Sequence, residues 1–150
     1  MNIEQYLENH ETLTYNNKGV SMLPMLVQDR DLMIVRKKDP EERLKKFDVA
    51  IYVSPTHQYV LHRIIRVDDK GYVFLGDNCV KKEYGIREEQ VIAVLTAFVH
   101  NGKKIEVTNF GYKFYSRFWY YIYLFRMIFK KTKFFLRRIK NKLFKIKPTA

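Results

Sequence analysis

Three short segments of this sequence carry side chains that together could perform nucleophilic catalysis. Ser21 lies in the segment GVSMLPML at residues 19–26, where a glycine and a proline frame a turn. His62 lies in a run rich in β-forming residues, and Asp77 follows a glycine at a sharp turn. A serine hydroxyl needs an adjacent base to become nucleophilic, and histidine titrates near neutral pH. The three segments therefore indicate nucleophilic catalysis assisted by a general base.

Each of these residues alone also has an ordinary explanation. An isolated histidine in a strand is more often structural than catalytic, and an aspartate after glycine often only forms a turn. The other three histidines, His10, His57 and His100, lie in segments typical of an N-terminal helix, a loop and a strand end. His62 is therefore the best candidate base. The support for this assignment comes from the order of the three segments along the chain.

The segments that must position these residues predict a mainly antiparallel β body. Two hairpin turns are expected at 68–71 and 101–102, and no helical pattern separates the strands as a βαβ fold requires. A short helix is expected at 3–9, a turn-rich stretch at 15–19 and a surface loop at 37–46. The expected strands are 31–35, 49–53, 59–67, 72–75, 91–99 and 104–107.

Charge divides the chain into two parts. Residues 1–109 contain 16 Lys and Arg and 16 Asp and Glu, whereas residues 110–150 contain 12 Lys and Arg and no acid. The second part therefore accounts for the whole formal charge of +12. We expect a catalytic domain over 1–109 and a basic, aromatic, helical tail over 110–150. A continuous amphipathic helix over about 112–146 would span roughly 50 Å.

The apolar residues of the tail allow more than one interpretation. Its stripe of Phe118, Ile122, Phe125, Phe129, Leu136, Ile139 and Leu143 could pack on the β body, or it could lie in the interface of an anionic membrane. Nucleic acid is a weaker alternative. A membrane span is disfavoured because basic residues interrupt every window of about 20 residues. Since residues 1–10 do not resemble a signal peptide, a location in the cytoplasm or at the cytoplasmic face of the membrane is expected.

Metal and cofactor chemistry is not expected. Cys79 is the single cysteine, so the chain cannot form an internal disulfide. The sequence contains no CxxC pair and no Cys/His cluster with the spacing of a metal site.

The order of the three segments, Ser-Met-x-Pro, His-Arg-Ile and Gly-Asp-Asn, resembles the type I signal peptidase and LexA-like serine peptidase superfamily. The resemblance covers about 19–99. Many bacterial members use a Ser-Lys pair, but here His62 stands before Arg63. The sequence is therefore more similar to the Ser-His branch, which contains the SipW-like, archaeal and endoplasmic-reticulum signal peptidases.

The resemblance implies a serine endopeptidase that cleaves a peptide or a protein precursor. Ser21 would attack the scissile carbonyl and His62 would act as general base, while an acid orients the imidazole. Two acids match this part of the pattern, Asp77 and Glu83, and the sequence leaves both open. The Ser21 backbone N–H would stabilise the oxyanion. The alternative is a catalytically poor, peptidase-like binding module anchored at a membrane surface by the tail.

Overall fold

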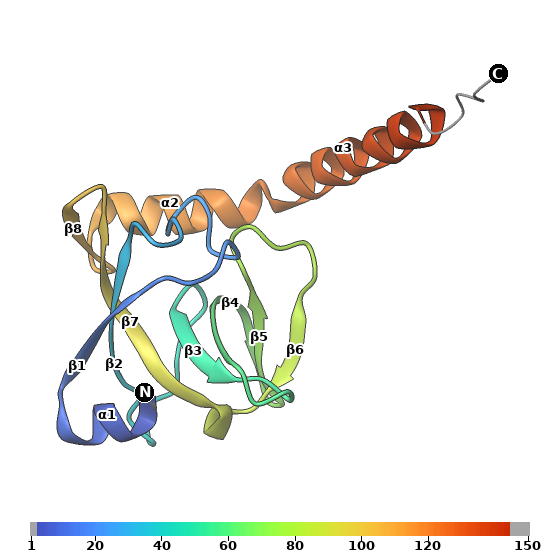
Figure 1. The fold of residues 1–150 in the computed structure, drawn as a ribbon. Helices are drawn as coiled ribbons and strands as arrows, with labels where there is room; N and C mark the ends of the chain where they lie inside the picture. The colour runs from blue at the N-terminus through green and yellow to red at the C-terminus, as the bar shows by residue number, and fades with distance from the viewer. Residues whose placement is uncertain (1–2, 145–150) are drawn as a thin grey trace.

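The structure of the protein, a computed structural model, describes residues 3–144, and its body is a curved antiparallel sheet (Figure 1). The strands follow the order β1-β2-β7-β3-β4-β5-β6, and β8 pairs with β7. The mainly antiparallel β prediction is confirmed. The strands are β1 (Thr12–Asn16), β2 (Leu32–Lys37), β3 (Val49–Val53), β4 (Tyr59–Asp68), β5 (Gly71–Leu75), β6 (Glu83–Ile86), β7 (Val91–His100) and β8 (Lys103–Glu106).

Both expected hairpin turns connect neighbouring strands, at 68–71 between β4 and β5 and at 101–102 between β7 and β8. The helix α1 (Ile3–Asn9) also lies where the sequence predicted it. Two strands, β1 and β6, were not predicted, and β1 overlaps the stretch at 15–19 that was assigned to a turn. Both are edge strands in which only one side chain is buried, so neither shows the regular apolar alternation that reveals a strand.

The curvature of the sheet separates two main apolar cores. The first lies between α1, β1, β2 and β7, and it takes in Met22, Met25 and Leu26 from the turn that carries Ser21. The second lies over β3, β4 and β5 and contains Tyr52 and Phe74, which are at most 1% exposed. Burial of this kind contributes about 25 cal/mol per Å² of apolar surface, so the three apolar residues after Ser21 anchor its turn firmly.

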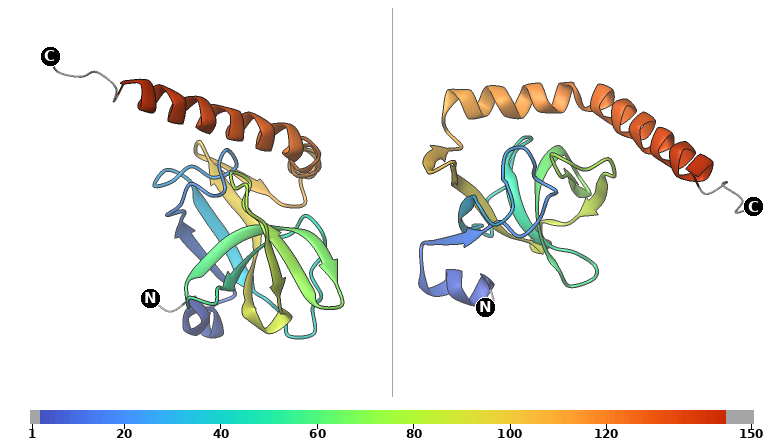
Figure 2. Two further views of the ribbon diagram at one scale, coloured as in Figure 1. Left: turned by 90° about the vertical axis from the view of Figure 1, so that its right-hand side faces the viewer. Right: turned by 45° about the horizontal axis from the view of Figure 1, so that its top comes forward.

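The C-terminal segment forms two helices where one was predicted, α2 (Phe110–Tyr121) and α3 (Tyr123–Phe144). They meet at Ile122, whose N–H is shared between the carbonyls of Phe118 and Tyr120. At this break the Trp119 carbonyl accepts a hydrogen bond from Arg126 Nη1 at 3.1 Å. Figure 2 shows α2 lying along the body and α3 leaving it. Residues 145 and 146 of the predicted helix lie outside the described residues.

The two helices turn a tyrosine-rich side, and not the predicted stripe, toward the body. Tyr112, Ser116 and Tyr123 are buried on the inner side. The predicted stripe faces outward: Phe118, Phe125, Phe129, Leu136 and Ile139 are exposed and Ile122 is half-buried, while the side chain of Leu143 lies outside the described part. The exposed members of the stripe therefore do not pack on the β body. Across residues 3–144, no helix combines the length and the hydropathy that a membrane span requires.

Candidate active site

Ser21 lies on a tight turn whose ends are tied to the β body. Asn17 N–H donates to the Asp31 carbonyl, and Asn17 Nδ2 donates to the Gly19 carbonyl at 2.7 Å. The buried Asp31 carboxylate accepts from the Val27 N–H at 2.8 Å. These bonds close the chain between β1 and β2 into a loop held at its base, so the position of Ser21 is set by buried groups on both sides.

A second segment, residues 76–80 between β5 and β6, holds the Ser21 turn from the other side. We call it the Asp77 loop. The Asn78 N–H donates to the Ser21 carbonyl at 2.7 Å, and Asn78 Nδ2 donates to the Val20 carbonyl at 3.0 Å. The Gly-Asp-Asn segment that the sequence singled out thus contacts the nucleophile turn directly, through its asparagine.

His62 on β4 is paired with Glu83 at the start of β6. His62 Nδ1 lies 3.0 Å from Glu83 Oε2, and the same carboxylate oxygen accepts a hydrogen bond from the Tyr52 hydroxyl. The His62 side chain is 8% exposed and that of Glu83 is 36% exposed. A carboxylate on Nδ1 selects the tautomer whose Nε2 can accept a proton. Of the two acids that the sequence left open, the structure places Glu83 against His62.

The other ring nitrogen of His62 faces the Ser21 turn across Gly76. A Cβ atom added to Gly76 would lie 2.8 Å from His62 Nε2 and 2.8 Å from the Ser21 carbonyl oxygen. Glycine is therefore required at residue 76 because the His62 ring and the Ser21 backbone converge on its Cα. The Cys79 thiol also lies here, with Sγ 4.0 Å from His62 Nε2.

Ser21, His62 and Glu83 line one cleft of about 520 Å³. Its walls are the chain from Tyr15 to Ser21 on one side and β4 from Tyr59 to His62 on the other. Among residues 3–144, neither the Ser21 hydroxyl nor its backbone N–H makes a hydrogen bond. Both groups of Ser21 thus remain available to a ligand in the cleft, and catalytic hydrogen bonds often tighten only when substrate is bound.

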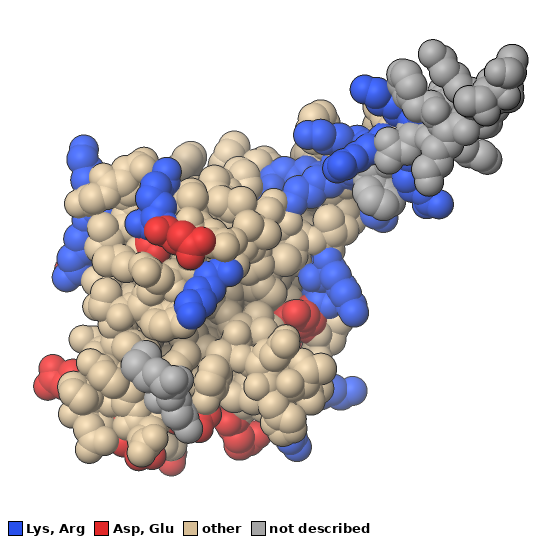
Figure 3. Space-filling view, viewed as in Figure 1, with Lys and Arg blue, Asp and Glu red and all other residues tan. Residues whose placement is uncertain are grey.

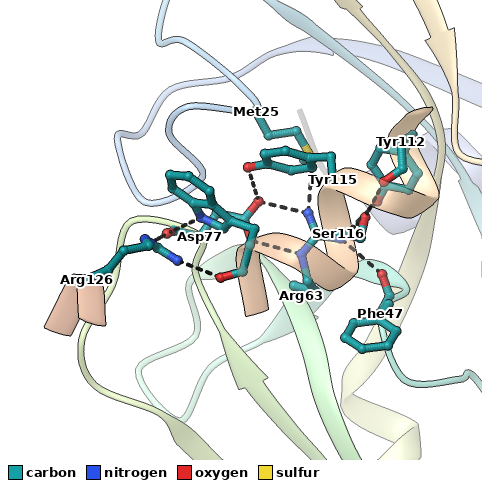
Figure 4. Close-up of polar contacts among 9 residues, drawn as sticks. Met25, Phe47, Arg63, Asp77, Tyr112, Tyr115, Ser116 and Arg126 are labelled. Atoms are coloured by element: carbon teal, nitrogen blue, oxygen red, sulfur yellow. Dashed lines mark hydrogen bonds and ion pairs between the residues drawn. The ribbon is translucent and has the colours of Figure 1, made fainter. Parts of the chain in front are cut away.

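Asp77 has a different partner, Arg63, the neighbour of His62 on β4 (Figure 4). Arg63 Nε and Nη2 each donate to one Asp77 carboxylate oxygen at 2.8 Å, and both side chains are at most 3% exposed. The Tyr115 hydroxyl donates to Asp77 at 2.9 Å. Arg63 Nη1 also reaches the Ser116 hydroxyl of α2 at 2.9 Å and the Phe47 carbonyl at 3.2 Å. Asp77 thus joins β4 to α2.

The C-terminal helices hold the backbone of the Asp77 loop as well. Trp119 Nε1 donates to the Asp77 carbonyl at 2.8 Å, and Arg126 donates to the same oxygen (Figure 4). Lys130 donates to both the carbonyl and the side-chain oxygen of Asn78. Since Asn78 also holds the Ser21 turn, the basic tail and the nucleophile are linked through a single residue.

Burial decides the protonation states in the cleft. It lowers the pKa of His62 to about 4, and the negative charge of Asp77 opposes this shift. Burial raises the pKa of Glu83 and also that of the Cys79 thiol. At neutral pH the imidazole is therefore uncharged and able to accept a proton, while Cys79 is a thiol. A thiol is a much weaker nucleophile than a thiolate.

Of the four predicted site residues, the structure brings Ser21, His62 and Glu83 to one cleft and places Asp77 behind it. Sequence reasoning missed Arg63, Tyr115 and Lys130, which fix the Asp77 loop. The signal for Arg63 was its position beside His62 in a strand that is otherwise apolar, where an arginine needs a buried counter-ion. Across the described residues 3–144, no group of three or more His, Cys, Asp and Glu side chains could hold a metal ion.

Comparisons with protein-family models, with curated proteins and with solved structures find no match.

Asp77→Asn should destabilise the protein far more than Glu83→Gln. Loss of the Asp77 charge leaves Arg63 buried without a counter-ion, which typically costs about 3–5 kcal/mol. Glu83 is partly exposed, so its neutral variant should change the free energy of unfolding by about 1 kcal/mol or less. Urea unfolding of both variants measures this difference. Equal destabilisation by the two substitutions would show that the acids do not have these separate roles.

Gly76→Ala should slow any reaction at Ser21 by about 100-fold or more. Its Cβ would meet the His62 ring and the Ser21 backbone, and displacement of reacting groups by about 1 Å can cost that factor. Gly19→Ala is the matched control, because its Cβ would meet only Ser21 Oγ, at an ordinary 3.9 Å. Peptide cleavage rates compare the two variants, and similar rates would contradict the convergence at Gly76.

Proposed function

We propose that this protein is a serine endopeptidase of signal-peptidase-like fold, with Ser21 as nucleophile, His62 as general base and Glu83 as the acid that orients the imidazole. The observation that carries the proposal is the contact between His62 Nδ1 and Glu83 Oε2 at 3.0 Å, with Nε2 directed at the Ser21 turn. The resemblance of the three sequence segments to Ser-His signal peptidases supports the same assignment.

The reaction follows from the roles of these groups. Ser21 Oγ attacks the scissile carbonyl carbon while His62 Nε2 takes the hydroxyl proton. Collapse of the tetrahedral intermediate breaks the C–N bond, and the proton moves from His62 to the leaving amine. Water then attacks the acyl-enzyme with His62 again as base, which releases the acid product and restores the Ser21 hydroxyl. Glu83 stabilises the imidazolium that forms in each half of the reaction.

The Ser21 N–H is our candidate for the oxyanion donor. It makes no hydrogen bond to the other described residues, and it belongs to the residue whose Oγ attacks. A donor fixed in place before the reaction stabilises the developing negative charge, and loss of one such donor typically costs about 10²–10³ in rate. The bond from Asn78 Nδ2 to the Val20 carbonyl holds this peptide unit from its other end, and Asn78 N–H holds the next peptide unit through the Ser21 carbonyl.

The substrate would bind as an extended peptide between the two walls of the cleft. Val60, Leu61 and His62 pair with β3 on one side, whereas β5 pairs with β4 only from Arg63 onward. Among the described residues, this part of β4 therefore has one strand neighbour. An extended peptide can add to such an edge through its backbone. Cleavage next to small side chains is expected by analogy with signal peptidases.

Cys79 is the competing nucleophile, because its thiol lies 4.0 Å from His62 Nε2. Its raised pKa argues against it, since a cysteine nucleophile acts as the thiolate. Burial of His62 also disfavours the imidazolium that would stabilise a thiolate. Ser21 needs no prior ionisation, because His62 removes its proton during the attack.

A peptide-binding module without activity is the second candidate. The observation in its favour is that, within residues 3–144, Ser21 Oγ makes no hydrogen bond to His62. The same cleft would then hold an extended peptide without cleaving it.

Cleavage of a library of precursor peptides by the purified protein tests the proposal. The wild type should cleave, whereas Ser21→Ala and His62→Ala should reduce kcat by at least about 10³-fold. Cys79→Ala is the matched control and should keep its rate within a few-fold of wild type. Peptide binding with no cleavage by wild type would support the binding module, and activity that survives Ser21→Ala but not Cys79→Ala would assign the nucleophile to the cysteine.

The pH dependence of kcat/KM provides a separate test. The neutral form of His62 is the active base, and its pKa is lowered to about 4, so activity should persist well below pH 6.5 and fall as the pH approaches 4. Glu83→Gln removes a negative charge beside the ring, which should move this acid limb to still lower pH. A limb at or above pH 6.5 in the wild type would contradict a buried, neutral His62.

A further inference from the structure

The outer side of α2 and α3 carries an apolar surface with no covering element. We define the outward stripe by six side chains between 40% and 77% exposed: Phe114, Phe118, Phe125, Phe129, Leu136 and Ile139. Their spacing of three, four and seven residues places them along one side of each helix. Folded proteins rarely expose contiguous apolar surface of this extent unless it binds something.

Polar contacts to the body fix the rotation of the helices and so hold the stripe outward. Tyr123 donates to the Val80 carbonyl, and Arg126 and Lys130 donate to carbonyls of the Asp77 loop. Turning the stripe inward would break these bonds and leave the carbonyls of the Asp77 loop without these donors. The exposure of the stripe is therefore a consequence of the polar contacts that hold the Asp77 loop.

Cations flank the stripe without any compensating acid. Lys113 and Arg117 on α2, and Lys131, Lys133 and Arg137 on α3, are exposed. The sequence from 110 to 150 contains no Asp or Glu. Figure 3 shows blue side chains along α3 where it leaves the body, while the red side chains on this face lie on the body. Each Lys or Arg near an anionic surface contributes roughly 1 kcal/mol.

We infer that the outward stripe seats α2 and α3 in the interfacial region of an anionic lipid bilayer, with the helices along the membrane plane and the β body on the aqueous side. An apolar face flanked by basic residues is the pattern of helices that lie in this region. Aromatic and aliphatic side chains enter the boundary between headgroups and acyl chains, and the basic residues meet lipid phosphates and carboxylates.

Other occupants fit the surface less well. Pairing of two stripes from separate copies would bring the flanking cations of both copies together without an acid in 110–150 to neutralise them. Nucleic acid would satisfy the cations through its phosphates but would leave the aliphatic part of the stripe in water. An anionic bilayer satisfies both parts of the surface.

Membrane binding would also place the catalytic cleft near the bilayer. Lys130 is on the helix that we assign to the membrane, and it holds Asn78, which holds the Ser21 turn. The position of a catalytic cleft near the bilayer rests on the proposed function, whereas the binding of α2 and α3 to lipid does not.

Vesicle flotation of the full chain in a Ser21→Ala background tests the inference without any contribution from proteolysis. The probes are vesicles of phosphatidylcholine alone and vesicles that contain about one third phosphatidylserine. The protein should float with the anionic vesicles, and its partition should fall with added salt because charge is screened. Phe125→Ser/Phe129→Ser should lower the partition at least tenfold, because both rings are more than 70% exposed in water and their loss does not open a core.

Matched variants distinguish binding through the stripe from nonspecific adsorption of exposed aromatic rings and from the effect of net charge. Tyr84→Ser removes an aromatic ring that is 63% exposed on β6 and should leave the partition unchanged. Lys131→Glu/Arg137→Glu should weaken binding far more than Lys70→Glu/Lys103→Glu, which changes the net charge equally on the body. The inference is overturned if the wild type does not float, if neutral vesicles bind it equally well, or if the stripe and body variants behave alike. It is also overturned if light scattering shows a dimer that the Phe125/Phe129 variant dissociates.

Discussion

Arg63 and Asp77 form a bidentate ion pair in the interior of the protein, and the positions of the candidate catalytic groups depend on it. Burial alone would lower the pKa of Arg63, but the adjacent Asp77 charge reverses this and raises it, so the guanidinium remains charged. A buried pair of this kind requires every remaining donor and acceptor to be satisfied. Arg63 does so with groups from α2, from the chain before β3 and from the Ser21 loop, where Met25 Sδ lies 3.3 Å from Nη2. Together these contacts join five separate parts of the chain: β4, the Asp77 loop, α2, the chain before β3 and the Ser21 loop.

This arrangement separates the tasks of the two acids near His62. Asp77 is bound by Arg63 and Tyr115, and its loop presents Asn78 to the Ser21 turn. Glu83 is more exposed and has His62 and Tyr52 as partners. Asp77, within the Gly-Asp-Asn turn, thus supports the architecture, and Glu83, on an edge strand, contacts the candidate base His62.

The sequence predicted most of the sheet because its central strands are continuous runs of β-branched and aromatic residues. It did not predict β1 and β6, which are short, mostly exposed and stabilised by pairing at the sheet edges. Ser21 and His62 were predictable as candidates from residue type and order. The choice between Asp77 and Glu83 was not, because it depends on how the chain turns between β5 and β6, which no local pattern reveals. The orientation of the tail stripe was also hidden, since it depends on polar contacts between α3 and residues some 50 positions earlier.

Covalent labelling of Ser21 tests the central claim most directly. An alkyl fluorophosphonate reacts with a serine hydroxyl only when a neighbouring base activates it, and mass spectrometry of a digest locates the adduct. We expect one adduct, on Ser21, with labelling at least about 10³-fold slower in His62→Ala and unaffected in Cys79→Ala. An unlabelled Ser21 in the folded wild-type protein, or labelling that His62→Ala does not slow, would contradict the assignment of a Ser21-His62-Glu83 catalytic site.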